Sequence, residues 1–210
     1  MRTAALTIAA VLLLAAQASA APIQLGRTIL TGGDPAHRAQ YQAWIDAGTA
    51  PQAAVYVRLI EADCPEAEGP GVPCVSTDDG RRWQLYMPPY LLEPQNVEGR
   101  FTEMDLLHEV GHIYDFSYTR DRHRTRFMRV FGYEGWLDPL NTTWEKWAMA
   151  YAYCSAGLSW AQYRRELPAD GSFASKLSTD HGGFWGYGYD VGKRDYRAAC
   201  RVVGQKAGAR

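Results

Sequence analysis

The residues His108-Glu109-Val110-Gly111-His112 read His-Glu-x-x-His, a spacing that suits metal chemistry. On a helix with about 3.6 residues per turn, His108 and His112 lie one above the other and can bind one ion from the same face. Glu109 lies about 100° further round the helix, where it can face a metal-bound water without binding the metal itself. The pattern predicts a hydrolytic zinc site with His108 and His112 as ligands and Glu109 as general base.

A catalytic zinc ion usually takes three protein ligands and a water, so one more ligand is needed. We favour Glu145, because it lies in the first turn of the next strongly helical stretch, and Ala148 after it would let two helices approach closely. A capping box formed by Thr142 and Glu145 is the structural alternative. We expect Asp115 to be a helix-end group or an acceptor for an imidazole N–H rather than a ligand, because it lies a further turn along the helix.

A family resemblance supports Glu145. The stretch Glu145-Lys-Trp-Ala-Met-Ala-Tyr151 resembles Glu-x-Phe-Ala-Glu-Ala-Phe/Tyr of some gluzincins, zinc peptidases whose third ligand is a glutamate on a later helix. It departs from that pattern at Met149, where a second glutamate is missing. The metzincin pattern fits less well, because Asp115 and Tyr118 occupy its glycine and last histidine positions. The resemblance covers roughly residues 101–155.

The resemblance implies an exported zincin-like metallopeptidase that binds Zn²⁺ through two histidines and Glu145. Its general base would be Glu109, and a tyrosine would stabilise the developing oxyanion. Tyr133 is the tyrosine that we predict, with Tyr187 and Tyr189 as equal alternatives. In zincins an edge strand pairs with extended substrate, and the strand at 53–61 or the one at 82–87 could serve here. A non-catalytic binding protein on the same fold, or a zinc hydrolase of a non-peptide amide or ester, remain as rival functions.

The predicted elements that position these residues form an α+β fold. Asp34-Pro35 begins a helix that runs to about residue 47, and the apolar alternation at 53–61 and 82–87 predicts two strands, paired as a hairpin in a small antiparallel sheet. Thr102 would cap a helix at 103–117, which carries the histidine pair. A second ligand-bearing helix is expected at 143–156 and a third at 159–166, while the tail beyond Pro168 is unassigned.

The first twenty residues have the composition of a signal peptide. Arg2 precedes an apolar run from Ala4 to Ala16, and Ala18-Ser19-Ala20 suits a signal peptidase, so we expect cleavage after Ala20. The alternative is a transmembrane anchor, for which the run is short. The domains expected are therefore the signal peptide at 1–20 and a zincin-like domain at 21–210, secreted or periplasmic.

Composition and cysteines agree with an exported enzyme. The net charge of -1 gives no reason to expect nucleic acid or an anionic membrane as a partner. We expect instead a peptide or protein substrate, no membrane association of the mature form, and a monomer. Four cysteines allow three disulfide connectivities, of which we favour Cys64–Cys74 and Cys154–Cys200. A zinc cluster is the alternative for the cysteines, but neither pair has the Cys-x-x-Cys spacing.

Overall fold

The computed structural model describes residues 28–48, 55–66, 72–89, 100–137, 143–161 and 192–204. The predicted signal peptide, Tyr187, Tyr189 and most of the helix predicted at 159–166 lie outside these residues. Within the described ranges, no helix combines the length and the apolar character that crossing a membrane requires.

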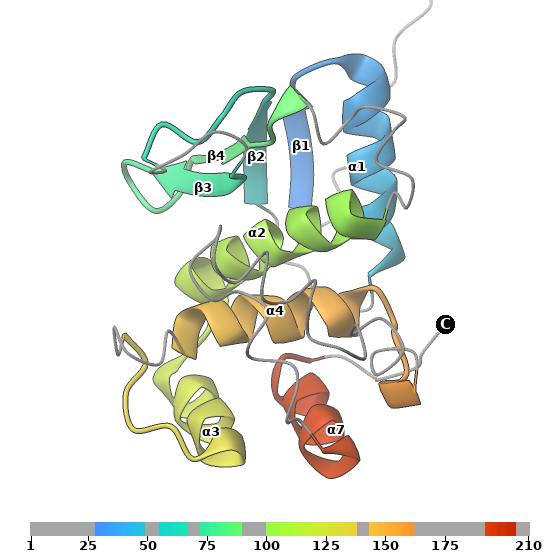
Figure 1. The fold of residues 1–210 in the computed structure, drawn as a ribbon. Helices are drawn as coiled ribbons and strands as arrows, with labels where there is room; N and C mark the ends of the chain where they lie inside the picture. Colours follow the sequence, from blue (N-terminus) through green and yellow to red (C-terminus); the bar gives the residue numbers. More distant parts are fainter. Residues whose placement is uncertain are drawn as a thin grey trace, which may run out of the picture.

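The fold class is α+β, with a four-stranded sheet of order β1-β2-β4-β3 (Figure 1). The prediction of an antiparallel sheet is wrong, because β1 pairs with β2 and β2 with β4 in parallel, and only β3 and β4 are antiparallel. The two predicted strands exist as β2 and β4, but β4 forms its hairpin with β3. The strands are β1 (Thr28–Gly32), β2 (Val55–Ile60), β3 (Cys74–Thr77) and β4 (Trp83–Tyr86).

The helix α1 explains the parallel pairing. Parallel neighbours need a crossover connection, and α1 (Pro35–Ala47) provides it between β1 and β2. The helix begins as predicted, because the side chain of Asp34 accepts hydrogen bonds from the backbone N–H groups of Ala36 and His37. Gln42 then bonds two backbone groups of β1, the N–H of Leu30 and the carbonyl of Thr28, each at 2.9 Å.

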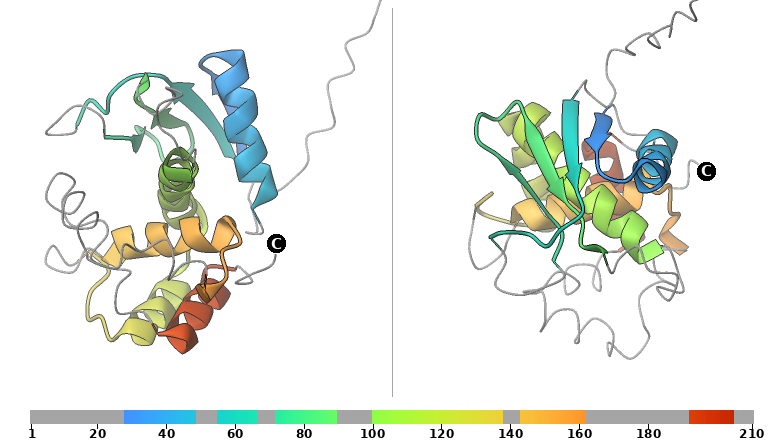
Figure 2. Two further views of the ribbon diagram at one scale, coloured as in Figure 1. Left: turned by 45° about the vertical axis from the view of Figure 1, so that its right-hand side comes forward. Right: turned by 90° about the horizontal axis from the view of Figure 1, so that it is seen from above.

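The other helices lie in layers beneath the sheet. The helix α2 runs between the sheet and α4, and α3 and α7 lie side by side beyond α4 (Figures 1 and 2). The predicted cap at Thr102 is wrong, because α2 begins two residues earlier. Neither α3 nor α7 was predicted. These helices are α2 (Arg100–Tyr118), α3 (Asp121–Phe131), α4 (Thr143–Ser155) and α7 (Lys193–Val202).

Two apolar clusters hold these layers together, and α2 contributes to both. Leu106, Val110 and Ile113 pack towards the sheet and α1, whereas Met104 and Leu107 pack towards α4 and α7. The helix α2 therefore joins the two clusters, and it also carries the histidine pair.

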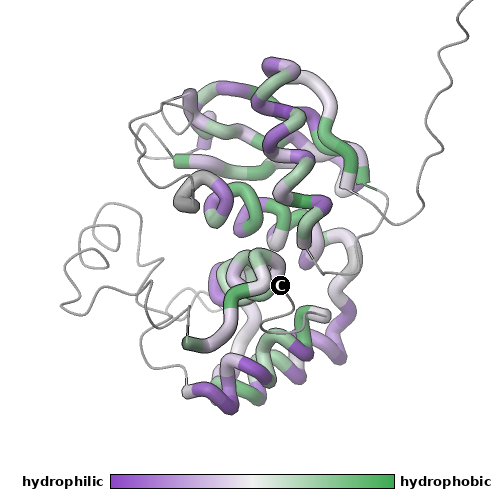
Figure 3. Tube along the Cα trace, turned by 90° about the vertical axis from the view of Figure 1, so that its right-hand side faces the viewer, coloured by the Kyte–Doolittle hydropathy of each residue, from purple (hydrophilic) through white to green (hydrophobic). Residues whose placement is uncertain are grey.

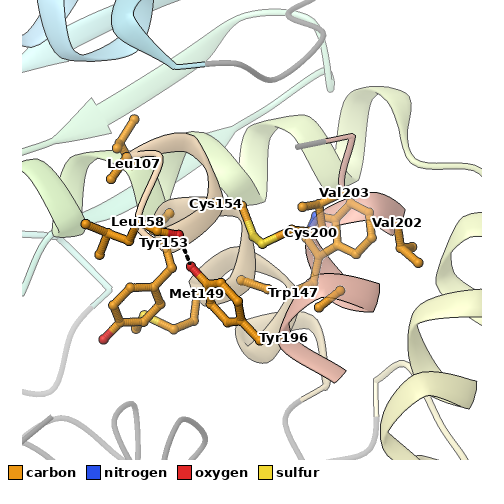
Figure 4. Packing of buried hydrophobic residues seen from close by; sticks show 14 of the residues in the cluster. Leu107, Trp147, Met149, Tyr153, Cys154, Leu158, Tyr196, Cys200, Val202 and Val203 are labelled. Carbon is orange, nitrogen blue, oxygen red and sulfur yellow. Dashed lines mark hydrogen bonds between the residues drawn. A yellow bond between two sulfur atoms is a disulfide. The ribbon is translucent and has the colours of Figure 1, made fainter. Parts of the chain in front are cut away.

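Both favoured disulfides are present. Cys64–Cys74 closes the loop before β3, and Cys154–Cys200 joins α4 to α7. The second bridge lies in the cluster shown in Figure 4, beside Tyr196, whose hydroxyl donates to the carbonyl of Leu158 at 2.8 Å. Two disulfides suggest a protein that matures in an oxidising compartment.

Candidate metal centre

Three side chains from two helices converge on one point. The Nε2 atoms of His108 and His112 lie 2.9 Å apart, and the Oε2 atom of Glu145 lies 3.0 Å from the first and 3.2 Å from the second. The structure therefore brings together the three residues predicted as ligands, from the middle of α2 and the first turn of α4. Among the described residues, His108, His112 and Glu145 form the one group of three or more His, Cys, Asp or Glu side chains close enough together to hold a metal ion.

The dimensions of this triangle suit a small divalent cation. A tetrahedral zinc ion with bonds of about 2.0–2.1 Å holds its ligand atoms about 3.3 Å apart, close to the three separations found here. Two imidazole nitrogens and a carboxylate oxygen are ligands that zinc accepts, although other divalent transition metals accept them as well.

Two of the three groups, His108 and Glu145, have the protonation of metal ligands, whereas in His112 burial is outweighed by the hydrogen bond with Glu145 together with the neighbouring carboxylates, which raise the pKa of the ring. Burial lowers the pKa of His108 to about 4, so its ring is neutral at pH 7 and keeps a lone pair for a metal. Burial disfavours ionisation of Glu145, but hydrogen bonds with His108 and His112 outweigh it and hold the pKa of Glu145 at about 2. Metal binding needs neutral imidazoles and an ionised carboxylate, and burial and pairing favour these states for His108 and Glu145.

The centre opens to solvent on the side of Glu145. The side chain of His108 is 2% exposed and that of His112 is 6% exposed, whereas that of Glu145 is 20% exposed. The rings are thus enclosed by protein, while the carboxylate of Glu145 borders the surface. A catalytic zinc site keeps one position for water or substrate, and the side of Glu145 is where solvent comes nearest to the ligands.

Glu109 lies beside the ligand group without belonging to it. Its carboxylate is buried and accepts a hydrogen bond from the backbone N–H of Val75 in β3. Burial raises the pKa of Glu109 to about 8. A buried carboxylate next to a metal centre is a candidate proton acceptor, as the spacing of the motif predicts.

Close packing of α2 on α4 sets the distance between the ligands. A Cβ atom added to Gly111 would lie 2.9 Å from Cα of Ala148, so only glycine allows this approach. The close contact expected at Ala148 is thereby confirmed, with Gly111 as its partner. The start of α4 is held separately, because the hydroxyl of Thr143 donates to the carbonyl of Gly135 at 2.7 Å.

Asp115 joins the two ligand helices through a third segment. Its buried carboxylate accepts hydrogen bonds from Nε of Arg124 in α3 and from Nε1 of Trp136, both at 3.1 Å. Trp136 directly follows Gly135, whose carbonyl accepts the hydrogen bond from Thr143 at the start of α4. The role of a helix-end group is therefore the one found. The alternative role, acceptor for an imidazole N–H, is not seen for His112, whose Nδ1 atom has no hydrogen-bond partner within the described residues.

Other expectations for the site have different outcomes. The ring of Tyr133 stacks on Phe131 and lies under the ammonium group of Lys146, 4.1 Å from the ring centre, and its role towards an oxyanion remains a prediction. The strands expected as substrate edges, β2 and β4, are both interior, because each pairs on two sides. The edge strand near the centre is β3, which was not predicted.

Two aromatic residues near the centre were also missed. The ring of Trp144 lies 4.9 Å from the ring of His112. Phe116, one turn after His112 on α2, is 57% exposed and packs against Trp83. Their positions could have been predicted from the sequence, because Trp144 directly precedes Glu145 and Phe116 lies four residues after His112 on the same helix.

Comparisons of the chain with protein-family models, with curated proteins and with solved structures give no match.

Proposed function

We propose that the protein is a zinc-dependent metallopeptidase of the zincin type, exported to the periplasm or secreted. One observation carries the proposal: the ligand atoms of His108, His112 and Glu145 lie within 3.2 Å of one another, and Glu109 lies on the same helix as the two histidines. The resemblance of the sequence around Glu145 to gluzincins supports the same function.

A zinc ion held by His108, His112 and Glu145 would supply an activated water, because the metal lowers the pKa of bound water to about 7. Glu109 is the group that would take up a proton at this site and release it to the leaving amine. Burial strengthens Glu109 as a base, and a neighbouring dication favours its ionised form. The N–H of Val75 fixes the carboxylate in place. In this proposal the hydroxyl of Tyr133 donates to the oxyanion.

The edge strand β3 supports a peptide as substrate. It pairs only with β4 among the described strands, so its other side is an edge of the sheet. An extended peptide could add to β3 as a further strand. Because Val75 of β3 bonds to Glu109, a peptide bound there would pass close to the proposed base.

The test is the variant Glu109→Gln, which keeps the shape of the side chain and removes its basicity. We expect it to bind zinc as the wild type does and to lose hydrolysis of casein, and a chelator should abolish the wild-type activity. An active, zinc-loaded Glu109→Gln variant would contradict this mechanism. Zinc binding without any cleavage would favour the non-catalytic binding protein, and cleavage of esters or non-peptide amides alone would favour the other hydrolase.

A further inference from the structure

The charges of this nearly neutral protein are strongly segregated. Arg120, α3 and α7 together carry nine arginines or lysines and two aspartates. This leaves 13 basic and 21 acidic residues for the rest of the chain. A net charge of -1 therefore conceals a strongly basic region of two short helices and an acidic remainder.

Three of the four basic residues of each helix form a stripe along it. In α3 they follow the spacing i, i+4, i+7, and in α7 the spacing i, i+3, i+7, so each set lies on one helix face. All six are exposed, whereas Phe127 of α3 and Tyr196 of α7 are buried on the opposite faces. We call these six residues the arginine face: Arg122, Arg126, Arg129, Arg194, Arg197 and Arg201.

The two stripes lie next to each other in space. More than 60 residues separate α3 from α7 along the chain, yet they pack side by side at the end of the molecule opposite the sheet (Figure 1). Hydrophilic residues recur along both helices at this end (Figure 3). Neighbouring helices lie about 8–10 Å apart and each stripe is about 10 Å long, so the charges cover an area rather than a line.

Most of these guanidinium groups are not neutralised within the described part of the protein. Arg194 pairs with Asp195, while Arg124, which is outside the arginine face, takes both Asp115 and Asp121. The other five members of the face form no ion pair with a described residue. Guanidinium groups are suited to phosphate, which they bind through two parallel hydrogen bonds.

We infer that the arginine face binds the phosphate groups of an anionic phospholipid surface. A planar array of phosphates meets both stripes at once, and the choice of a phospholipid rests on the proposed export, because an exported protein meets membrane surfaces. The exposed large apolar side chains of the described residues are Tyr56, Phe116 and Leu137, none of them on α3 or α7. The described residues of α3 and α7 therefore offer charge rather than exposed large apolar side chains, and binding through them is electrostatic.

The experiment is sedimentation of the purified protein with phosphatidylcholine vesicles, with or without 30% phosphatidylglycerol. We expect binding only to the anionic vesicles, falling at least tenfold between about 50 and 500 mM salt because salt screens the attraction. Each arginine near an anionic surface contributes about 1 kcal/mol, so the triple variant Arg122→Gln, Arg126→Gln, Arg197→Gln should bind about 100-fold more weakly.

A matched control removes the same charge elsewhere. Arg58, Arg81 and Arg82 are exposed on the sheet and its β3–β4 turn, and replacing all three with glutamine should change vesicle binding less than threefold. Equal losses in the two triple variants, or equal binding to neutral and anionic vesicles, would overturn the inference. Binding to nucleic acid or to an acidic protein without vesicle binding would overturn it as well. Circular dichroism checks that both variants fold, and the readout does not depend on zinc or on hydrolysis.

Discussion

Replacing Gly111 with alanine tests the packing that sets the ligand distance. In an ordinary helix interior, glycine to alanine stabilises a protein by about 1 kcal/mol. At Gly111 the added Cβ would lie 2.9 Å from Cα and 3.0 Å from the carbonyl oxygen of Ala148, and 3.1 Å from Cβ of Tyr151. Carbon atoms normally stay about 3.5–4.0 Å apart, so α2 and α4 must separate by about 0.5–1 Å.

The expected cost follows from these distances. Overpacking of a core usually costs about 1–3 kcal/mol, and the gain in helix propensity returns about 1 kcal/mol. We therefore expect Gly111→Ala to destabilise the metal-free protein by about 1–2 kcal/mol, which lowers Tm by about 2–8 °C for a chain of this size. The same separation moves Glu145 away from the histidines by more than the ~0.2 Å tolerance of zinc bonds, so zinc affinity should fall at least tenfold.

Thermal unfolding and a competitive zinc titration measure the two effects. Gly111→Ser should be worse than Gly111→Ala, because its side chain is larger. Ala148→Gly should not rescue the alanine variant, because the two closest contacts are with backbone atoms that it leaves in place. A Gly111→Ala protein that is more stable than wild type, with unchanged zinc affinity, would refute the close approach of the helices.

Two further predictions concern carboxylates of α2, Asp115, which is buried, and Asp105, which is partly buried. Asp115→Asn should weaken zinc binding by about 10–100-fold in a titration, because it weakens the hydrogen bond to Trp136 that connects α2 to the start of α4. The control is Tyr196→Phe, which removes a buried hydrogen bond elsewhere and should destabilise the protein without lowering its zinc affinity. Burial raises the pKa of Asp105 to about 7. As the pH rises from about 4 to 7, Asp105 therefore ionises in the unfolded chain before it does in the folded protein, and the free energy of unfolding falls. Asp105→Asn should therefore stabilise the protein by about 1–3 kcal/mol at pH 8 and by almost nothing at pH 4 in urea unfolding, and equal effects at both pH values would contradict the burial of a neutral Asp105.

The ligand group could be predicted because its signals are local. The spacing of His108 and His112 fixes them on one helix face, and Glu145 lies in the first turn of a stretch with clear helical character. The small residue Ala148 pointed to a close helix contact, although its partner Gly111 was not named. Both disulfides were also correct, since one closes a short loop rich in glycine and proline.

The sheet topology and two helices could not be predicted in the same way. The strands β1 (TILTG) and β3 (CVST) lack the alternation of large apolar and polar residues that marks β4 (WQLY), and without β1 nothing indicated a parallel pairing. Few apolar residues mark α3, of which only Phe127 is buried. The basic residues at 120–129 could be recognised in the sequence, but the packing of α3 against α7 brings together segments that are far apart in the chain. For that reason the net charge gave no indication of an anionic surface as partner.

The metal content of the purified protein is the most direct test of the proposed centre. We expect one zinc ion per chain in the wild type and in Glu134→Ala, which removes an exposed carboxylate outside the ligand group. The variant Glu145→Ala should lose zinc under the same dialysis, because two imidazoles alone hold it weakly. A wild-type protein without stoichiometric metal, or a Glu145→Ala variant that retains it, would contradict the assignment of His108, His112 and Glu145 as a metal site.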